Sequence, residues 1–345
     1  MQECINYKQL GAKNVQCLTC AHYCQIKPDQ VGVCGVRQNV GGKLFLLTYG
    51  KAAAAHVDPI EKKPLFHFLP GSTVYSFGTV GCNFCCGNCQ NHDISQMFGW
   101  KGQAKEYAGV EWGYPLSPEE IVEEALAHEC PSIAYTYNEP TISLEYMLDT
   151  MKLAKQKGLR NVWVSNGFMS PETIELIVPF LDAINIDIKS FEDKFYRQQC
   201  GGKVTRVLEN CQQLVQRGIW LEVTTLVIPT LSDQLGMLEQ IATFIKEKLG
   251  TGVPWHVSAF SGCISWKLKD LPDTPTELVE RVHQAGKRAG LQYVYAGNVQ
   301  RPDLESTYCP QCGEVVIERV GYQVTRYDRS GCCANCGCRI AGVFA

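Results

Sequence analysis

Short runs of β-branched and aromatic residues alternate with helix-like stretches through the middle of the chain. This alternation is typical of βα units arranged around a parallel sheet. It predicts an α/β fold in which six or seven parallel strands form a partial or closed barrel. The predicted strands cover residues 73–80, 132–137, 161–165, 183–188, 220–227 and 255–260, and a candidate seventh covers 293–295.

The stretches between these strands carry recognisable helix ends. Ser117, Pro118 and Glu120 supply an N-cap, a proline at the first helical position and a glutamate that can complete a capping box. The segment from Thr274 to Glu277 repeats this pattern. Helices are expected to end where glycine can adopt the left-handed conformation, near Gly158, Gly218, Gly250 and Gly290.

Length and charge set the broad class of the protein. The 345 residues are 45% hydrophobic, which is ordinary for one large globular domain with small attachments. A formal net charge of −3 gives no electrostatic indication of a nucleic-acid partner. The N-terminus lacks the features of a signal peptide, and no apolar run approaches the roughly 20 residues that cross a bilayer. We therefore expect a cytoplasmic protein without a membrane partner.

The 19 cysteines fall mostly into three groups, within residues 4–34, 82–89 and 309–338. Cytoplasmic thiols are kept reduced, so this number favours metal ligation over disulfides. The grouping predicts an N-terminal cysteine-rich segment over 1–70, a core barrel over 71–300 and a C-terminal module over 301–345. The scattered cysteines are expected to be small buried hydrophobes: Cys130, Cys200, Cys211 and Cys263.

The central group follows the first predicted strand directly. Cys82, Cys86 and Cys89 have the spacing Cys-x3-Cys-x2-Cys, and thiolates this close in a glycine-containing loop can hold a 4Fe–4S cluster. Three protein ligands leave one iron open, and S-adenosylmethionine can chelate that iron. The motif predicts reductive cleavage of S-adenosylmethionine to a 5′-deoxyadenosyl radical that abstracts hydrogen from a substrate.

Two alternatives remain for this loop. One is a zinc knuckle that uses Cys82, Cys85 and Cys89, and the other is a set of reduced thiols without metal. The corresponding non-enzymatic hypothesis is a metal-stapled scaffold or nucleic-acid-binding protein in which all three cysteine groups hold zinc.

The sequence resembles the radical SAM superfamily, and within it the enzymes related to the pyruvate formate-lyase activating enzyme. It looks similar to the AmmeMemoRadiSam system radical SAM enzymes, which are associated with Memo-like and AMMECR-like proteins. The resemblance implies a partial (β/α)6 barrel, anaerobic chemistry and an electron donor such as flavodoxin or ferredoxin. It rests on residues 17–24, 34–37, 82–91, 135–140, 165–168, 187–189, 226–229 and the C-terminal cysteine pairs.

The resemblance also assigns cofactor contacts near the carboxyl ends of the predicted strands, where a barrel gathers its active site. It implies that Asn138 and Glu139 recognise the methionine amino group of S-adenosylmethionine. It implies that Asn166, in a motif with Ser165, contacts the cofactor carboxylate or ribose. From the residues alone, Asn166 could equally belong to a simple loop turn.

Three further contacts follow from the same resemblance. Asp187 and Lys189 would contact the ribose hydroxyls and the carboxylate of the cofactor, and Val227 would pass its backbone beside adenine. Without the resemblance, Asp187 and Lys189 could form only a solvated ion pair of small energetic value.

Two further cysteine sets flank the predicted barrel. The C-terminal set forms two Cys-x2-Cys pairs that suit tetrahedral zinc in a ribbon-like module: Cys309, Cys312, Cys333 and Cys336. The N-terminal set satisfies either zinc or an auxiliary iron–sulfur cluster: Cys17, Cys20, Cys24 and Cys34. The spacing alone does not separate these two metals.

Two enzymatic hypotheses follow for the substrate. The activating-enzyme resemblance favours hydrogen abstraction from a glycine of a partner protein. The second hypothesis is radical modification of a small metabolite or peptide together with Memo-like and AMMECR-like partners.

Overall fold

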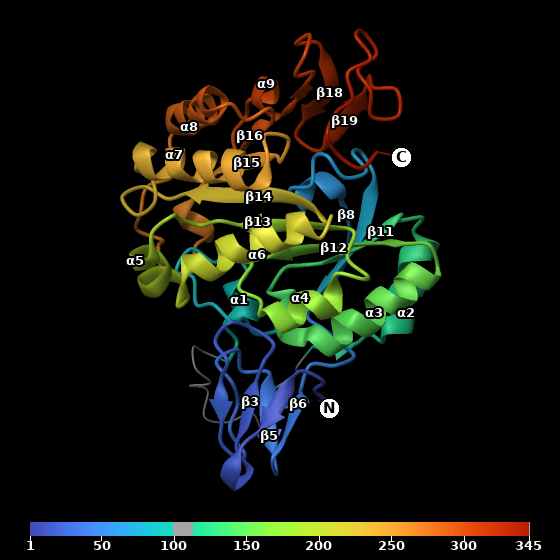
Figure 1. Ribbon diagram of the computed structural model, residues 1–345, viewed down its shortest axis with the longest axis vertical. Helices are drawn as coiled ribbons and strands as arrows, with labels where there is room; N and C mark the ends of the chain where they lie inside the picture. Colours follow the sequence, from blue (N-terminus) through green and yellow to red (C-terminus); the bar gives the residue numbers. More distant parts are fainter. Residues whose placement is uncertain (99–112, 345) are drawn as a thin grey trace.

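An eight-stranded sheet forms the centre of the molecule in the computed structural model, which describes residues 1–98 and 113–344 (Figure 1). Seven strands run parallel in the order β16-β15-β14-β13-β12-β11-β9, and β8 pairs antiparallel with β9 at the edge. Within the described ranges β8 and β16 do not pair with each other, so the barrel is open. The strands are β8 (Ala54–Pro59), β9 (Thr73–Gly78), β11 (Ser132–Tyr135), β12 (Arg160–Ser165), β13 (Ala183–Asp187), β14 (Trp220–Val227), β15 (Trp255–Ala259) and β16 (Val294–Gly297).

The predicted partial barrel is confirmed, and the candidate seventh strand corresponds to β16. The sequence prediction did not include β8. This strand has no clean alternation of apolar and polar positions, because His56 and Val57 are both exposed. Since β8 belongs to the main sheet, residues of the segment predicted over 1–70 contribute to the barrel.

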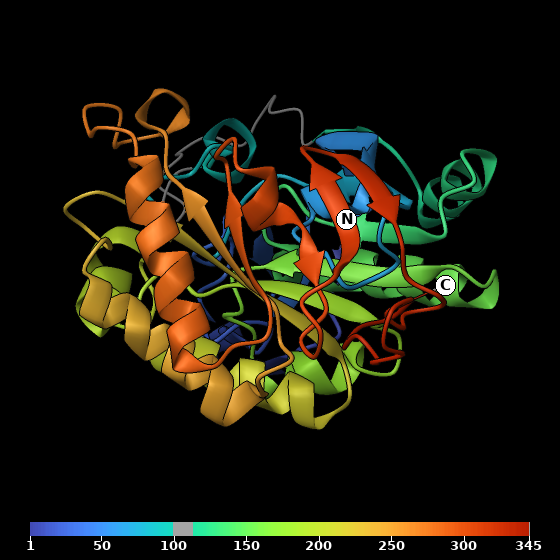
Figure 2. The same ribbon diagram turned by 90° about the horizontal axis from the view of Figure 1, so that it is seen from above.

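Helices cover the outside of the curved sheet (Figure 2). None of those in the described ranges combines the length and apolarity needed to cross a lipid bilayer. The longer helices are α2 (Pro118–Ala127), α3 (Leu144–Gln156), α4 (Pro171–Ile177), α6 (Val204–Gln216), α7 (Leu235–Phe244) and α8 (Thr276–Ala289). The short helices are α1 (His92–Ser95), α5 (Asp193–Phe195) and α9 (Pro302–Glu305), and further helical turns cover Gly11–Lys13, Ile60–Lys62, Pro140–Ser143, Tyr196–Cys200, Ile245–Leu249 and Gly262–Ile264.

The helix ends follow the sequence in all but one case. The capping box is present at α2, where Ser117 Oγ accepts from Glu120 N and Glu120 Oε2 accepts from Ser117 N. The cap predicted at Thr274 is wrong, because α8 begins at Thr276 without a side-chain cap. The Thr274 hydroxyl instead donates to the Val227 carbonyl at 2.6 Å, which ties the start of α8 to the end of β14.

The N-terminal segment packs on the carboxyl edge of the barrel, around the loops that follow β9, β11 and β12. Cys20 forms a bridge with Met169 beyond β12, and Arg37 donates to the Ile142 carbonyl beyond β11 at 2.8 Å. Arg37 also forms a buried ion pair with Glu145 at 2.6 Å. The short strands of this segment are β1 (Gln2–Glu3), β2 (Tyr7–Gln9), β3 (Val15–Cys17), β4 (Gln25–Ile26), β5 (Arg37–Val40) and β6 (Lys43–Leu46), with β7 (Lys51–Ala52) paired to β10 (Tyr114–Pro115).

The C-terminal module closes the opposite, amino edge of the barrel (Figure 1). It consists of β17 (Thr307–Tyr308), β18 (Val315–Val320) and β19 (Gln323–Arg326) with the cysteine loops beside them. Below it, the fully buried Glu222 accepts from the backbone N–H groups of Phe66 and His67 at 2.9 and 2.8 Å and pairs with His256 at 2.7 Å. These contacts hold the segment before β9 inside the end of the barrel.

His67 makes the stability of this end depend on pH. Its ring contacts the Ala341 carbonyl at 2.6 Å and the Tyr295 hydroxyl at 2.5 Å, and burial lowers its pKa from 6.5 to about 4. The unfolded chain therefore takes up a proton between these pH values while the folded chain does not. We expect the free energy of unfolding to fall by up to about 3 kcal/mol as the pH drops from about 6.5 to about 4. Equilibrium denaturation across this range measures the effect.

Two histidine variants separate this contribution from that of other groups. His67→Gln removes the titrating ring and should flatten this part of the pH profile, even if the variant is less stable at neutral pH. His128→Gln, at the exposed residue that directly follows α2, should leave the pH profile unchanged. An unaltered slope in His67→Gln would contradict the assignment.

Candidate active site at the carboxyl edge of the barrel

The loop with the three predicted cluster cysteines follows β9 directly. Cys86 is buried, while Cys82 and Cys89 are half-buried, and Cys89 Sγ lies 3.2 Å from Ser95 Oγ. Gly81, with φ 89°, begins the loop, and a Cβ atom there would lie 2.6 Å from the Cys34 carbonyl oxygen. The loop therefore requires glycine at this position, and it lies directly against the N-terminal segment.

Cys200 also belongs to this site, although the sequence prediction treated it only as a buried hydrophobe. It is buried, its carbonyl accepts from Cys85 N at 2.9 Å, and its thiol hydrogen-bonds to Cys86. That hydrogen bond lowers the pKa of Cys86, whereas burial raises the pKa of Cys82 and of Cys89. The same prediction is wrong for Cys263, which is exposed.

The surroundings of the loop fit a bound cluster with a polar ligand beside it. Among the described residues, Asn83 Nδ2, Asn88 Oδ1 and His92 Nδ1 are buried without a hydrogen-bond partner. Buried polar atoms are paired in the great majority of cases, so three unpaired atoms in this loop and at the start of α1 indicate a place for hydrogen-bonding groups of a ligand. The three thiols of the loop can bind the iron atoms of a cluster, and the three unpaired polar atoms can bind the ligand beside it.

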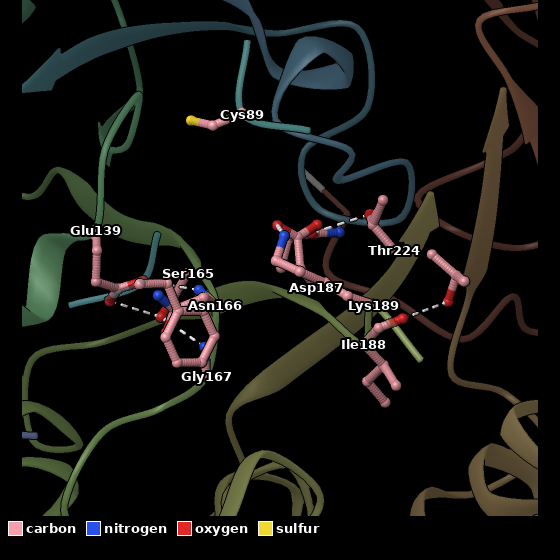
Figure 3. Close-up of polar contacts among 12 residues, drawn as sticks. Cys89, Glu139, Ser165, Asn166, Gly167, Asp187, Ile188, Lys189 and Thr224 are labelled. Atoms are coloured by element: carbon pink, nitrogen blue, oxygen red, sulfur yellow. Dashed lines mark hydrogen bonds and ion pairs between the residues drawn. The ribbon is translucent and has the colours of Figure 1, made fainter. Parts of the chain in front are cut away.

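Glu139 connects the ends of β11 and β12 (Figure 3). Its Oε1 accepts from Ser165 Oγ at 2.8 Å and from Thr141 Oγ1 at 2.5 Å, and its Oε2 accepts from Asn166 N at 2.8 Å. Burial raises the pKa of Glu139, and these hydrogen bonds oppose the rise. Among the described residues Oε2 accepts one hydrogen bond, from Asn166 N, so it keeps capacity for a further donor.

Asn138 and Asn166 attach these strand ends to the cysteine loop. Asn138 Nδ2 donates to the Gly81 carbonyl at 3.0 Å, and Asn138 Oδ1 accepts from Thr79 N at 3.1 Å. Asn166 Nδ2 donates to Asn83 Oδ1 at 2.7 Å. Both amides thus orient the loop from within the protein, a role that the sequence analysis did not include.

Asp187 and Lys189 lie on the other side of the site (Figure 3). They form an ion pair at 2.7 Å in which the Lys189 side chain is only 14% exposed, so the pair is not a solvated surface contact. Burial alone would lower the pKa of Lys189, but Asp187 and the nearby thiol of Cys86 raise it well above its usual value. Lys189 is therefore a fixed positive charge next to the cysteine loop.

Val227 lies at the end of β14, on the same edge of the sheet. It is fully buried, and its carbonyl is occupied by the Thr274 hydroxyl. The structure thus brings Val227 to the carboxyl edge of the sheet, where its backbone carbonyl contacts the Thr274 hydroxyl.

Tyr137 and its partners were not predicted from the sequence. Tyr137 has φ 68°, and its hydroxyl donates to Asp58 Oδ2 at 2.7 Å, while Lys63 pairs with the same carboxylate oxygen at 2.6 Å. Asn91 Nδ2 donates to the Tyr137 carbonyl at 2.7 Å. The antiparallel strand β8 therefore positions the backbone immediately before Asn138. No short motif signals this contact, because it joins residues 79 positions apart.

The C-terminal cysteines form a compact group. The sulfur atoms of Cys309, Cys312, Cys333 and Cys336 all lie within 4.8 Å of one another, with distances of 3.5 Å for Cys309 to Cys336 and 3.7 Å for Cys312 to Cys333. Four thiols at this separation fit one tetrahedral metal ion. The predicted ribbon-like module is thereby confirmed as a four-cysteine metal-binding arrangement.

Comparison with known proteins gives the family of the chain. The sequence pattern of the family described as the Radical SAM superfamily matches residues 77–244, from β9 to α7, which include the cysteine loop, Glu139 and Lys189. Residues 77–244 of the chain carry a radical SAM domain. This family implies an enzyme that uses a 4Fe–4S cluster and S-adenosylmethionine, and the unpaired polar atoms around the cysteine loop agree with such ligands.

Individual relatives differ in how much of this radical SAM chain they match. The uncharacterized protein MJ0808 of Methanocaldococcus jannaschii is 41% identical over 92% of both chains. The pyruvate formate-lyase-activating enzyme of Clostridium pasteurianum is 24% identical over 55% of this chain and 80% of its own. Among solved structures, a radical SAM methyltransferase from Sphaerobacter thermophilus has a TM-score of 0.50 at 14% identity, covering 72% of this chain and 71% of its own, and supports the fold.

The Glu139 contacts predict a specific loss of stability. Glu139→Gln keeps the shape of the side chain but replaces one carboxylate oxygen with an amide donor, which then faces N–H or O–H donors. We expect the free energy of unfolding to fall by about 1–3 kcal/mol, measured by urea denaturation. Glu123→Gln, at an exposed position of α2, is the matched control and should change it by less than about 0.5 kcal/mol. Equal effects in the two variants would contradict this role.

Proposed function

We propose that Cys82, Cys86 and Cys89 hold the 4Fe–4S cluster of this radical SAM enzyme and leave one iron open for S-adenosylmethionine. The observation that carries the proposal is the convergence of this loop with Glu139, Asn166 and the Asp187–Lys189 pair at one edge of the barrel. When bound, the cluster supplies the electron that cleaves S-adenosylmethionine, and the resulting 5′-deoxyadenosyl radical abstracts hydrogen from the substrate.

The protein side chains bind and orient the cofactor in this proposal. Glu139 Oε2, with its remaining acceptor capacity, receives a hydrogen bond from the methionine ammonium, and Asn138 holds the backbone of the loop in place. Lys189 offers its positive charge to the cofactor carboxylate, and Asp187 accepts from ribose hydroxyls. Ser165 and Asn166 contact the carboxylate or the ribose of the cofactor, and the backbone at Val227 lies beside adenine.

For the substrate, we propose a glycine of a partner protein, from which the enzyme abstracts hydrogen. The support comes from relatives named as activating enzymes, the pyruvate formate-lyase-activating enzyme and the (2S)-3-sulfopropanediol dehydratase activating enzyme of Klebsiella oxytoca. In this proposal a protein such as flavodoxin or ferredoxin donates the electron. Incubation with a candidate partner and detection of a glycyl radical by EPR tests the substrate.

A second candidate for the substrate is favoured by how little of this chain the activating enzyme matches. The activating enzyme of Clostridium pasteurianum matches 55% of this chain, whereas the chain also carries cysteine modules at both ends. The AmmeMemoRadiSam resemblance accounts for these modules and favours modification of a metabolite or peptide with Memo-like and AMMECR-like partners. Co-purification of such partners, with no glycyl radical formed, would support this candidate over the first.

We also propose that the C-terminal cysteines hold zinc, because zinc–thiolate bonds of 2.3 Å place tetrahedral sulfurs about 3.8 Å apart. The distances of 3.5 and 3.7 Å agree with this geometry. Cys312→Ser is expected to remove about one zinc ion per chain and to lower the thermal unfolding temperature. Elemental analysis measures the metal, and Cys332→Ser, which lies outside the four-cysteine group, should retain it. Retention of zinc by Cys312→Ser would contradict the assignment.

The reaction class has a direct test. Anaerobically reconstituted and reduced protein should form 5′-deoxyadenosine from S-adenosylmethionine, and Cys86→Ala should abolish this product because a cluster ligand is lost. Chromatography of the quenched mixture measures it. Cys85→Ala is the matched control, since it removes the adjacent thiol that the proposal leaves out of the ligand set. Wild-type amounts of product from Cys86→Ala, or loss of product only in Cys85→Ala, would refute the proposed ligands.

A further inference from the structure

The four N-terminal cysteines surround one pocket in the N-terminal segment. Cys17, Cys20, Cys24 and Cys34 all line the same pocket. Three of them are buried and Cys24 is half-buried. The remaining walls come mainly from aliphatic side chains such as Ile26. The pocket therefore offers four thiols without a carboxylate or imidazole ligand among its lining residues.

The spacing of these thiols differs from that of the zinc-like group. Among the described residues, only the C-terminal cysteines form a group of three or more whose sulfur atoms all lie within 4.8 Å of one another. Neither the four N-terminal cysteines nor the set of Cys82, Cys86 and Cys89 meets this condition, although all of them are described. The N-terminal set thus shares the wider arrangement of the loop to which we assign the 4Fe–4S cluster.

Wider spacing follows from the geometry of a cluster. A single zinc ion draws four sulfur atoms to about 3.8 Å from one another. In a polynuclear cluster the thiolates bind different iron atoms, so at least some of them lie farther apart, and bridging sulfides fill the space between. An aliphatic pocket that holds four separated thiols therefore fits a polynuclear cluster better than a single zinc ion.

Two other side chains of the pocket suit a negatively charged cluster. Arg37 lines the pocket as a fully buried cation, held by its ion pair with Glu145 and its bond to the Ile142 carbonyl. The hydroxyl of Thr19 is buried, lines the same pocket and has no hydrogen-bond partner within the described ranges. A hydroxyl that can donate to a sulfide or thiolate is a usual feature around iron–sulfur clusters.

We propose that Cys17, Cys20, Cys24 and Cys34 hold a second, polynuclear iron–sulfur cluster and not a zinc ion. The Cys34 carbonyl lies against Gly81, immediately before Cys82, so this second cluster neighbours the loop of the first. The site rests on its own cysteines and does not depend on the reaction proposed above.

The test uses the full chain, purified and reconstituted without oxygen, with the triple variant Cys82→Ala, Cys86→Ala and Cys89→Ala. Because this variant lacks the first cluster site, any cluster that remains belongs elsewhere. We expect it to retain roughly two to four iron atoms per chain with matching sulfide, and an iron–sulfur Mössbauer signature. Wild-type protein should contain about one zinc ion per chain, at the C-terminal group. Neither measurement requires cleavage of S-adenosylmethionine, so failure of the proposed reaction leaves this result readable.

Further substitutions in the triple variant identify the ligands. Adding Cys20→Ala or Cys34→Ala should remove the remaining iron while the zinc content stays constant. Cys4→Ala is the matched control, because Cys4 is buried in the same segment but does not line the pocket, and it should retain the iron. If a ligand variant fails to fold, the metal content of the folded triple variant still decides. A triple variant with no iron, a wild-type protein with two zinc ions, or iron that survives both ligand substitutions would overturn the proposal.

Discussion

The buried carboxylate of Glu139 is the interaction on which the geometry of this site depends. An ionised carboxylate without partners in the interior would cost several kcal/mol, so its position is tolerated only while Thr141, Ser165 and Asn166 donate to it. These donors come from two adjacent strand ends, β11 and β12. Because Asn166 also binds Asn83, the same carboxylate indirectly sets the orientation of the cysteine loop. A cofactor site requires such positioning from residues that do not themselves move.

Most of the barrel could be predicted from sequence because parallel strands are buried on both faces and appear as continuous apolar runs. The β11 run has all four residues buried, and the seven parallel strands, β9 and β11 to β16, were each anticipated. The carboxyl ends of these strands meet at one edge, which explains why Glu139, Asn166 and Lys189 could be placed together in advance. The ribbon-like module was predictable for a different reason, since its four ligands come in two short, regularly spaced pairs.

What escaped the sequence analysis depends on contacts between distant residues. β8 has two exposed residues in succession and obtains its place only by pairing with β9. Thr274 has the right residue type for a helix cap, yet the Val227 carbonyl is a nearer partner in the folded chain. Cys200 belongs to no motif, and its proximity to Cys86 arises because the turn after α5 packs on the cysteine loop. Local propensity and spacing contain no information about these partners.

The buried pair of Arg37 and Glu145 has a consequence for how the chain matures. The two residues are 108 positions apart, and Thr19 contacts Thr173 over 154 positions, so this segment is synthesised well before its packing partners. Long-range closure of this kind is slow and leaves early segments open during synthesis. Arg37 cannot enter the interior before the helix that carries its counter-charge exists. The N-terminal thiols therefore become enclosed only after about half of the protein has been translated.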